Sequence, residues 1–92
     1  MALLRIRRRI TLFDPATYAI RICGVLAPTW SDQMGGMRIT VVEAGDEAIT
    51  ELVGRLADQA ALHGVLAGLY ELGFPMLSVE YLPNPVDSTP RP

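Results

Sequence analysis

The segment DQAALHGVLAGLYELGFPMLSVEYL, residues 58–82, decides the fold, because it holds a complete helix followed by a strand. Asp58 is a preferred helix N-cap, whereas Gly73 and Pro75 are typical of a helix end. Between them, apolar residues recur at the spacing of one buried helical stripe: Leu62, Val65, Leu66, Leu69 and Leu72. The pattern then changes to a strand over residues 76–82, with Leu77, Val79 and Tyr81 on one face.

Three more strands are predicted upstream of this helix. The first covers residues 18–26, where Ile20, Ile22 and Leu26 share a face with Tyr18. Two others, over residues 37–43 and 48–56, flank a hairpin turn at residues 44–47. One helical turn is expected over residues 30–34, capped by Thr29 and Asp32 and ended by Gly35-Gly36.

This order of elements predicts a two-layer α+β domain, in which one helix covers one face of a four-stranded, mostly antiparallel sheet. The link between the first two strands is too short for a full helix, so we expect a three-strand meander followed by helix and strand. A reduced ferredoxin-like fold is the alternative. If the strands around the helix are parallel, their crossover should be right-handed. The second sheet face has no helix to cover it, which favours a partner.

Composition limits the class of protein. The 92 residues fit one domain, 50% are hydrophobic, 20% are charged, and the net charge is −2. The apolar content excludes a fully disordered chain. The single cysteine, Cys23, excludes a disulfide scaffold, and the apolar runs are too short for a transmembrane span. Because the apolar content is high for a small domain, we expect apolar surface to remain exposed and to favour self-association. The alternative is a compact monomer in which many alanines raise the apolar content.

Charge and proline divide the chain into three parts. Residues 1–17 are interpreted as an arginine-rich arm or edge strand, since they hold Arg5, Arg7, Arg8 and Arg9 and alternate apolar residues from Leu4 to Leu12. Residues 18–82 form the single α+β domain, and residues 83–92 a proline-rich tail. The apolar run at residues 10–13 is too short for a secretory signal, which together with the unpaired thiol predicts a cytoplasmic location.

Four motifs lie in residues 18–82: Trp30-Ser31-Asp32, Gly36-Met37-Arg38-Ile39-Thr40, Asp58-Gln59-Ala60-Ala61-Leu62-His63-Gly64 and Leu72-Gly73-Phe74-Pro75-Met76-Leu77-Ser78-Val79. They resemble those of a group of small uncharacterised bacterial proteins. The resemblance covers about two thirds of the 92-residue chain. It implies a bacterial origin and a shared fold, and it assigns no catalytic residue.

Four residues are candidate contacts for a ligand or partner. Trp30 lies on a connection, either as a lid over the core with Asp32 capping the turn, or as an aromatic anchor. His63, the single histidine, lies at the edge of the helical stripe near Tyr70. It is either a boundary residue or a group that contacts a ligand or transfers a proton.

Other chemistries are not supported. Cys23 and His63 lack metal-ligand spacing, and Gly35-Gly36 lacks the Lys and Ser/Thr of a phosphate-binding loop. The carboxylates form no catalytic pair on a common face. Cys23 is interpreted as a small buried residue rather than a nucleophile. We therefore expect no metal, no cofactor and no catalytic residue.

The helix also carries a face of small residues: Ala60, Gly64, Ala67 and Gly68. Each interior glycine costs about 1 kcal/mol relative to alanine. Close approach by the helix of a second copy would offset that cost, and the alternative is a simply exposed face.

These observations favour a non-catalytic, self-associating interaction module, a homodimer or higher homo-oligomer without a membrane partner. One alternative is a small-molecule sensor or small enzyme with a pocket near Trp30 and His63. The other is nucleic-acid binding by the arginine-rich arm. The net charge of −6 on residues 10–92, from four arginines and ten acids, opposes that binding.

Overall fold

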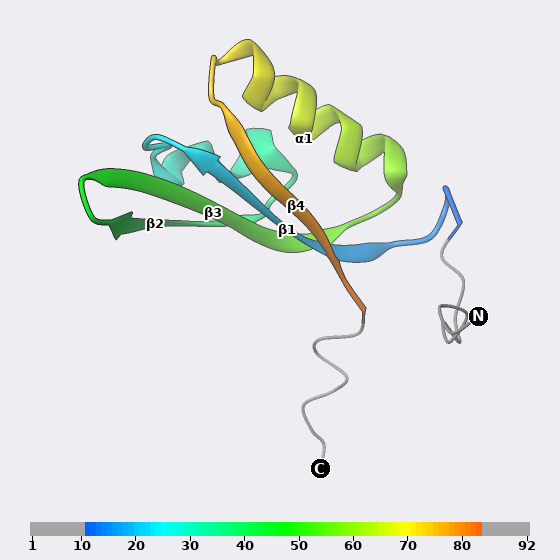
Figure 1. Ribbon diagram of the computed structural model, residues 1–92. Coiled ribbons are helices and arrows are strands. Elements are labelled where there is room, and N and C mark those ends of the chain that lie inside the picture. Colours follow the sequence, from blue (N-terminus) through cyan, green and yellow to red (C-terminus); the bar gives the residue numbers. More distant parts are fainter. Residues whose placement is uncertain (1–10, 84–92) are drawn as a thin grey trace.

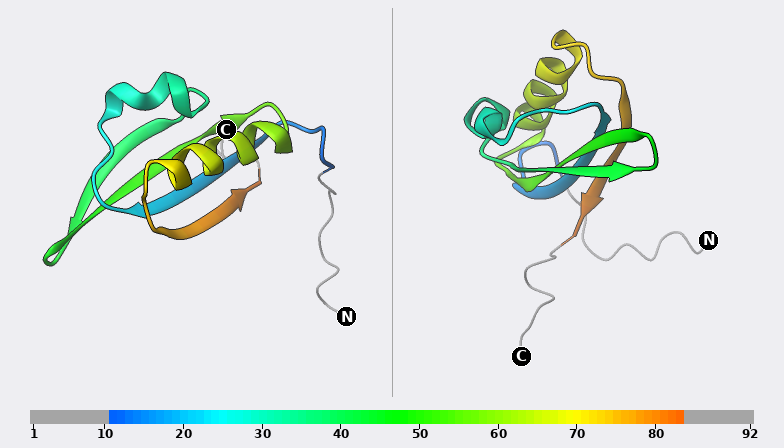
Figure 2. Two further views of the ribbon diagram at one scale, coloured as in Figure 1. Left: turned by 90° about the horizontal axis from the view of Figure 1, so that it is seen from above. Right: turned by 90° about the vertical axis from the view of Figure 1, so that its left-hand side faces the viewer.

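The computed structural model describes residues 11–83, which form two layers (Figure 1). One layer is an antiparallel sheet of four strands in the order β2-β3-β1-β4. The other holds the helix α1 and the 3-10 helix η2, which lie on the same side of the sheet (Figure 2). The elements run β1 (Ala16–Cys23), η2 (Pro28–Met34), β2 (Arg38–Ala44), β3 (Glu47–Leu56), α1 (Gln59–Glu71) and β4 (Met76–Leu82). The predicted α+β class is confirmed.

The strand order corrects the expected meander. β1 lies in the middle of the sheet, antiparallel to both β3 and β4, whereas β2 pairs with β3 at one edge. β3 and β4 are thus parallel, with β1 between them and α1 as the crossover. This is the reduced ferredoxin-like arrangement, in which η2 replaces the first helix. A 3-10 helix rises about 2 Å per residue, so the seven residues of η2 can carry the chain across β3 to β2.

Both boundaries of α1 agree with the sequence prediction. The Asp58 side chain accepts a hydrogen bond from the Ala61 amide at 2.9 Å, and Gly73 adopts a left-handed φ of 88°. Leu72 is the C-cap and is 42% exposed, so its predicted place in the buried stripe is wrong. Leu72 keeps right-handed helical backbone angles, but it follows the last residue of α1 and its side chain stays partly in solvent.

Two other boundaries differ from prediction. β1 covers Ala16–Cys23 rather than residues 18–26, because Gly24 leaves the strand with a φ of 117°. The N-cap of η2 is Ala27, without a side-chain hydrogen bond, so the predicted cap by Thr29 is wrong. Pro28 occupies the first turn, where its missing N–H costs no hydrogen bond.

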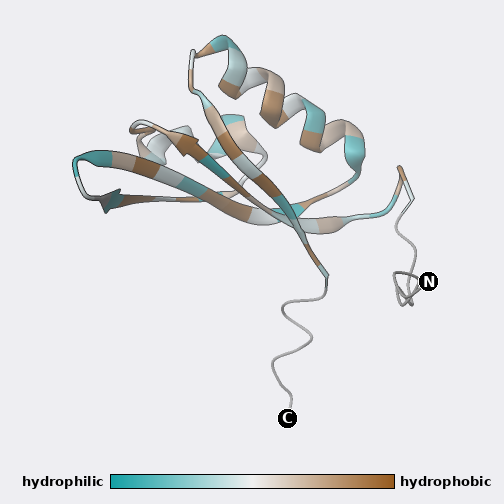
Figure 3. Cartoon of the chain, viewed as in Figure 1, coloured by the Kyte–Doolittle hydropathy of each residue, from teal (hydrophilic) through white to brown (hydrophobic). Residues whose placement is uncertain are grey.

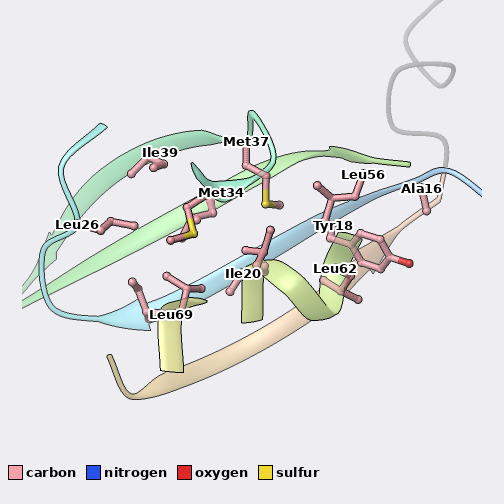
Figure 4. Close-up of a cluster of buried hydrophobic side chains, with 13 residues drawn as sticks. Ala16, Tyr18, Ile20, Leu26, Met34, Met37, Ile39, Leu56, Leu62 and Leu69 are labelled. Atoms are coloured by element: carbon pink, nitrogen blue, oxygen red, sulfur yellow. The ribbon is translucent and has the colours of Figure 1, made fainter. Parts of the chain in front are cut away.

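The core lies between the sheet and the helical layer (Figure 4). Thr50 is its buried polar residue, and its hydroxyl donates to the Gly24 carbonyl at 2.6 Å and accepts from the Leu26 amide at 3.1 Å. These two hydrogen bonds pair backbone carbonyl and amide groups just after the end of β1. The core side chains are Ala16, Tyr18, Ile20, Ile22, Leu26, Met34, Met37, Ile39, Leu52, Leu56, Leu62, Val65 and Leu69.

The chain ends lie mostly outside the described range. Residues 1–10 of the predicted arm and residues 84–92 of the predicted tail fall outside it. Thr11 to Asp14 form a turn, so the expectation that Leu12 continues a strand is wrong. The Leu12 carbonyl accepts a hydrogen bond from the Gln59 amide at 3.0 Å, which ties this turn to the start of α1. Neither helix within residues 11–83 has the length and apolar character needed to cross a membrane.

Candidate interaction surface

The helical layer covers the sheet unevenly. Ile20 of β1 is fully buried, but Val79, its partner in β4, is 43% exposed. Tyr18 and Tyr81 differ in the same way. The β4 side chains are more exposed because α1 packs against β3 and η2, which leaves β4 beside the helix rather than beneath it (Figure 2). The outer strand therefore keeps much of its apolar surface in solvent.

The neighbouring flank of α1 extends this apolar surface. Tyr70 is 79% exposed and lies on the same side of the helix as Gln59, whose side-chain amide donates to the Tyr18 hydroxyl at 2.6 Å. A hollow of about 320 Å³ joins Tyr70 to the start of β4. Figure 3 shows the hydrophobic residues along β4. We name the β4 surface by its exposed apolar residues: Tyr70, Met76, Leu77, Val79 and Tyr81.

β4 is also an edge strand, because among residues 11–83 it pairs only with β1. No strand within this range bonds to its outer backbone N–H and C=O groups, which can therefore pair with another strand. Proteins commonly protect such an edge with lysine or proline, yet β4 contains neither, and Glu80 is its single charge. The opposite edge, β2, carries Arg38 and Glu43.

Tyr81 is held against the body of the domain by Tyr18. Their ring centroids are 6.0 Å apart at an interplanar angle of 50°, a tilted aromatic contact. Burial raises the pKa of the Tyr18 hydroxyl, repulsion from Tyr81 adds to the rise, and the hydrogen bond from Gln59 opposes it. This contact fixes one end of the β4 surface.

The four predicted contact residues do not form one site. Trp30 and Asp32 lie on η2, and Met34 of η2 faces the Gly68 side of α1. His63 and Tyr70 lie on the other side of α1 by helical spacing, and both are exposed. Of these four residues, Tyr70 lines the hollow at the start of β4, whereas Trp30 and His63 do not.

The small residues of α1 have different surroundings. A Cβ on Gly68 would lie 3.5 Å from Met34 Cε, so η2 packs closely there within the same chain. A Cβ on Gly64 would meet nothing within 4 Å, and Ala60 and Ala67 are exposed. Cys23 is a free, half-buried thiol. Within residues 11–83, no three His, Cys, Asp or Glu side chains lie together as a metal site would require.

The sequence predicts Tyr70 as a contact residue, but it does not predict the β4 residues beside Tyr70. Leu77, Val79 and Tyr81 alternate as they would in a buried strand, and that pattern alone cannot show whether a helix covers them. The lack of lysine, arginine and proline in residues 76–82 is the sequence signal that indicates an unprotected edge strand.

These features define a two-layer α+β domain with an apolar, unprotected edge strand. The chain belongs to the family described as Domain of unknown function (DUF8691), whose family model matches residues 17–80. Comparison with curated proteins and with solved structures gave no match. The matched range includes all of α1 and most of β4.

Proposed function

We propose that the protein is a non-catalytic interaction module that forms a homodimer through its β4 surface. One observation carries the proposal: β4 is an edge strand that has no protecting charge or proline on its apolar side and leaves Leu77 52% exposed. Such a strand presents free backbone groups and apolar side chains together, which is the arrangement used for pairing with another strand.

The sequence of β4 is complementary to itself. Two copies paired antiparallel about a two-fold axis at Val79 place Leu77 opposite Tyr81, and Ser78 opposite Glu80. Each Ser78 hydroxyl can then donate to a Glu80 carboxylate of the second copy. A register centred on Glu80 would instead place two carboxylates directly opposite each other, which is destabilising. A second copy of this chain therefore fits the surface better than an arbitrary strand.

The expected energetic gain comes from burial and strand pairing. Completing the burial of a half-exposed valine, leucine or tyrosine contributes on the order of 1 kcal/mol. A two-fold interface counts each residue twice, because both copies present the same patch. Backbone hydrogen bonds would then satisfy the open edge of both sheets and give one continuous sheet.

Disulfide trapping tests this register. In a Cys23→Ala background, Val79→Cys is expected to form a covalent dimer readily under mild oxidation, because opposed residues of an antiparallel pair have Cα atoms about 4.5 to 5.5 Å apart. Non-reducing electrophoresis measures the product. Glu80→Cys is the matched control, since its opposite residue is Ser78. Equal cross-linking of the two variants, or none at Val79, would refute the proposed pairing.

The alternatives expected from the sequence have less support. A sensor or enzyme site shared by Trp30 and His63 would need these residues on one side of α1, and they lie on different sides. The arginines of the arm fall outside residues 11–83. We also infer a bacterial cytoplasm as the setting, which the unpaired Cys23 thiol supports.

A further inference from the structure

The arginines of the described chain gather on the open face of the sheet, the face opposite α1 and η2. Residues 11–83 contain three arginines against nine acids, and Arg21, Arg38 and Arg55 all lie on this face. Arg21 is neutralised by Glu51, with a guanidinium nitrogen 3.1 Å from the carboxylate. Arg38 and Arg55 form no ion pair with any residue of this range. Two unpaired cations in an acidic domain are therefore placed side by side.

These two arginines line a hollow of about 510 Å³. Arg38 is opposite Val53 in the β2–β3 pair, which places Arg55 diagonally next to Arg38 on the same face of the sheet. Gly36 also lines the hollow, and a Cβ at this position would meet nothing within 4 Å, so Gly36 leaves open space there. In the described part of the chain, the hollow is lined by Thr17, Gly36, Arg38, Val53, Gly54, Arg55 and Leu82.

The chemistry of this lining suits an anion. Guanidinium groups bind phosphate through paired, charge-assisted hydrogen bonds. No carboxylate of residues 11–83 lines the hollow, and Thr17, opposite Arg55 in β1, adds a hydroxyl donor. Val53 and Leu82 supply an apolar wall. Two cations within reach of one ligand favour a doubly charged group over a single carboxylate.

We propose that this hollow binds a phosphate monoester, with Arg38 and Arg55 holding the phosphate and the apolar wall contacting the attached organic group. The site does not depend on dimer formation, because it lies on the open face whereas pairing through β4 uses the edge of the sheet. Its test can therefore succeed or fail independently of the proposed homodimer.

Titration of the isotopically labelled protein with phenyl phosphate at constant ionic strength tests the site. The amide resonances of Gly36 and Gly54 are expected to shift and saturate. Inorganic phosphate should bind more weakly because it lacks the apolar group, and benzoate more weakly still because it carries one charge. Inorganic phosphate binding as tightly as phenyl phosphate would refute the contact with the apolar wall.

Variants assign the binding to the two arginines. Arg38→Gln and Arg55→Gln should each raise the dissociation constant of phenyl phosphate by about fivefold or more. Arg21→Gln, on the same face but already paired with Glu51, should change it by less than about twofold. Arg38→Lys retains the charge but loses the guanidinium fork, so intermediate binding is expected. No saturation in the parent protein, or an unchanged constant in Arg38→Gln and Arg55→Gln, would overturn the proposal.

Discussion

Replacing Val79 by arginine is expected to raise the dissociation constant of the homodimer by about a hundredfold or more. In the proposed pairing, Val79 of one copy faces Val79 of the other, so the substitution places two cations directly opposite each other. It also removes the central apolar contact of the β4 surface. Because Val79 is already 43% exposed in one copy, the isolated domain should remain folded.

Val41→Arg is the matched control for this experiment. Val41 lies in the other edge strand, on the face that the helices cover, and is 37% exposed. It should leave the dissociation constant within a few fold of the parent value. Sedimentation velocity of the two variants at equal concentration distinguishes them. If Val41→Arg dissociated the homodimer and Val79→Arg did not, the interface would lie at the β2 edge, which would contradict the proposal.

Truncation of Leu69 to alanine is expected to lower the free energy of unfolding by about 3 to 4 kcal/mol. Leu69 is completely buried and points from α1 into the core (Figure 4). Removing its isobutyl group loses apolar burial and leaves a cavity that the sheet cannot fully close. Guanidinium unfolding measures the change, best in the Val79→Arg background so that association does not contribute to stability.

Leu72→Ala provides the comparison for Leu69. The two leucines are three residues apart, and the sequence pattern places both in one stripe, but Leu72 is the exposed C-cap of α1. Its truncation should cost less than about 1 kcal/mol. A similar loss from both substitutions would contradict the observed end of the helix.

Local chemistry explains why α1 and the β2–β3 hairpin could be predicted. The cap at Asp58, the left-handed Gly73 and the turn at Gly45 act on neighbouring residues, so a short stretch of sequence determines each boundary. The central position of β1 depends instead on pairing with residues about 30 and 60 positions away. No pattern within the first strand distinguishes a central strand from an edge strand of a meander.

The candidate sites depend even more on tertiary structure. Val79 is exposed because of where α1 rests, not because of its own neighbours in sequence. Arg38 and Arg55 come together only through the register of the β2–β3 pair. Trp30 and His63 are both unusual in the sequence, but Trp30 lies on η2 whereas His63 lies on the side of α1 that faces away from η2. A residue's position in the sheet is therefore a better guide to the β4 surface than the rarity of its residue type.

Sedimentation equilibrium of the unmodified protein, from about 1 to 100 μM, tests the homodimer most directly. The mass should rise with concentration from that of the 10.0 kDa chain toward twice that value. A mass of 10.0 kDa at every concentration would contradict self-association through β4.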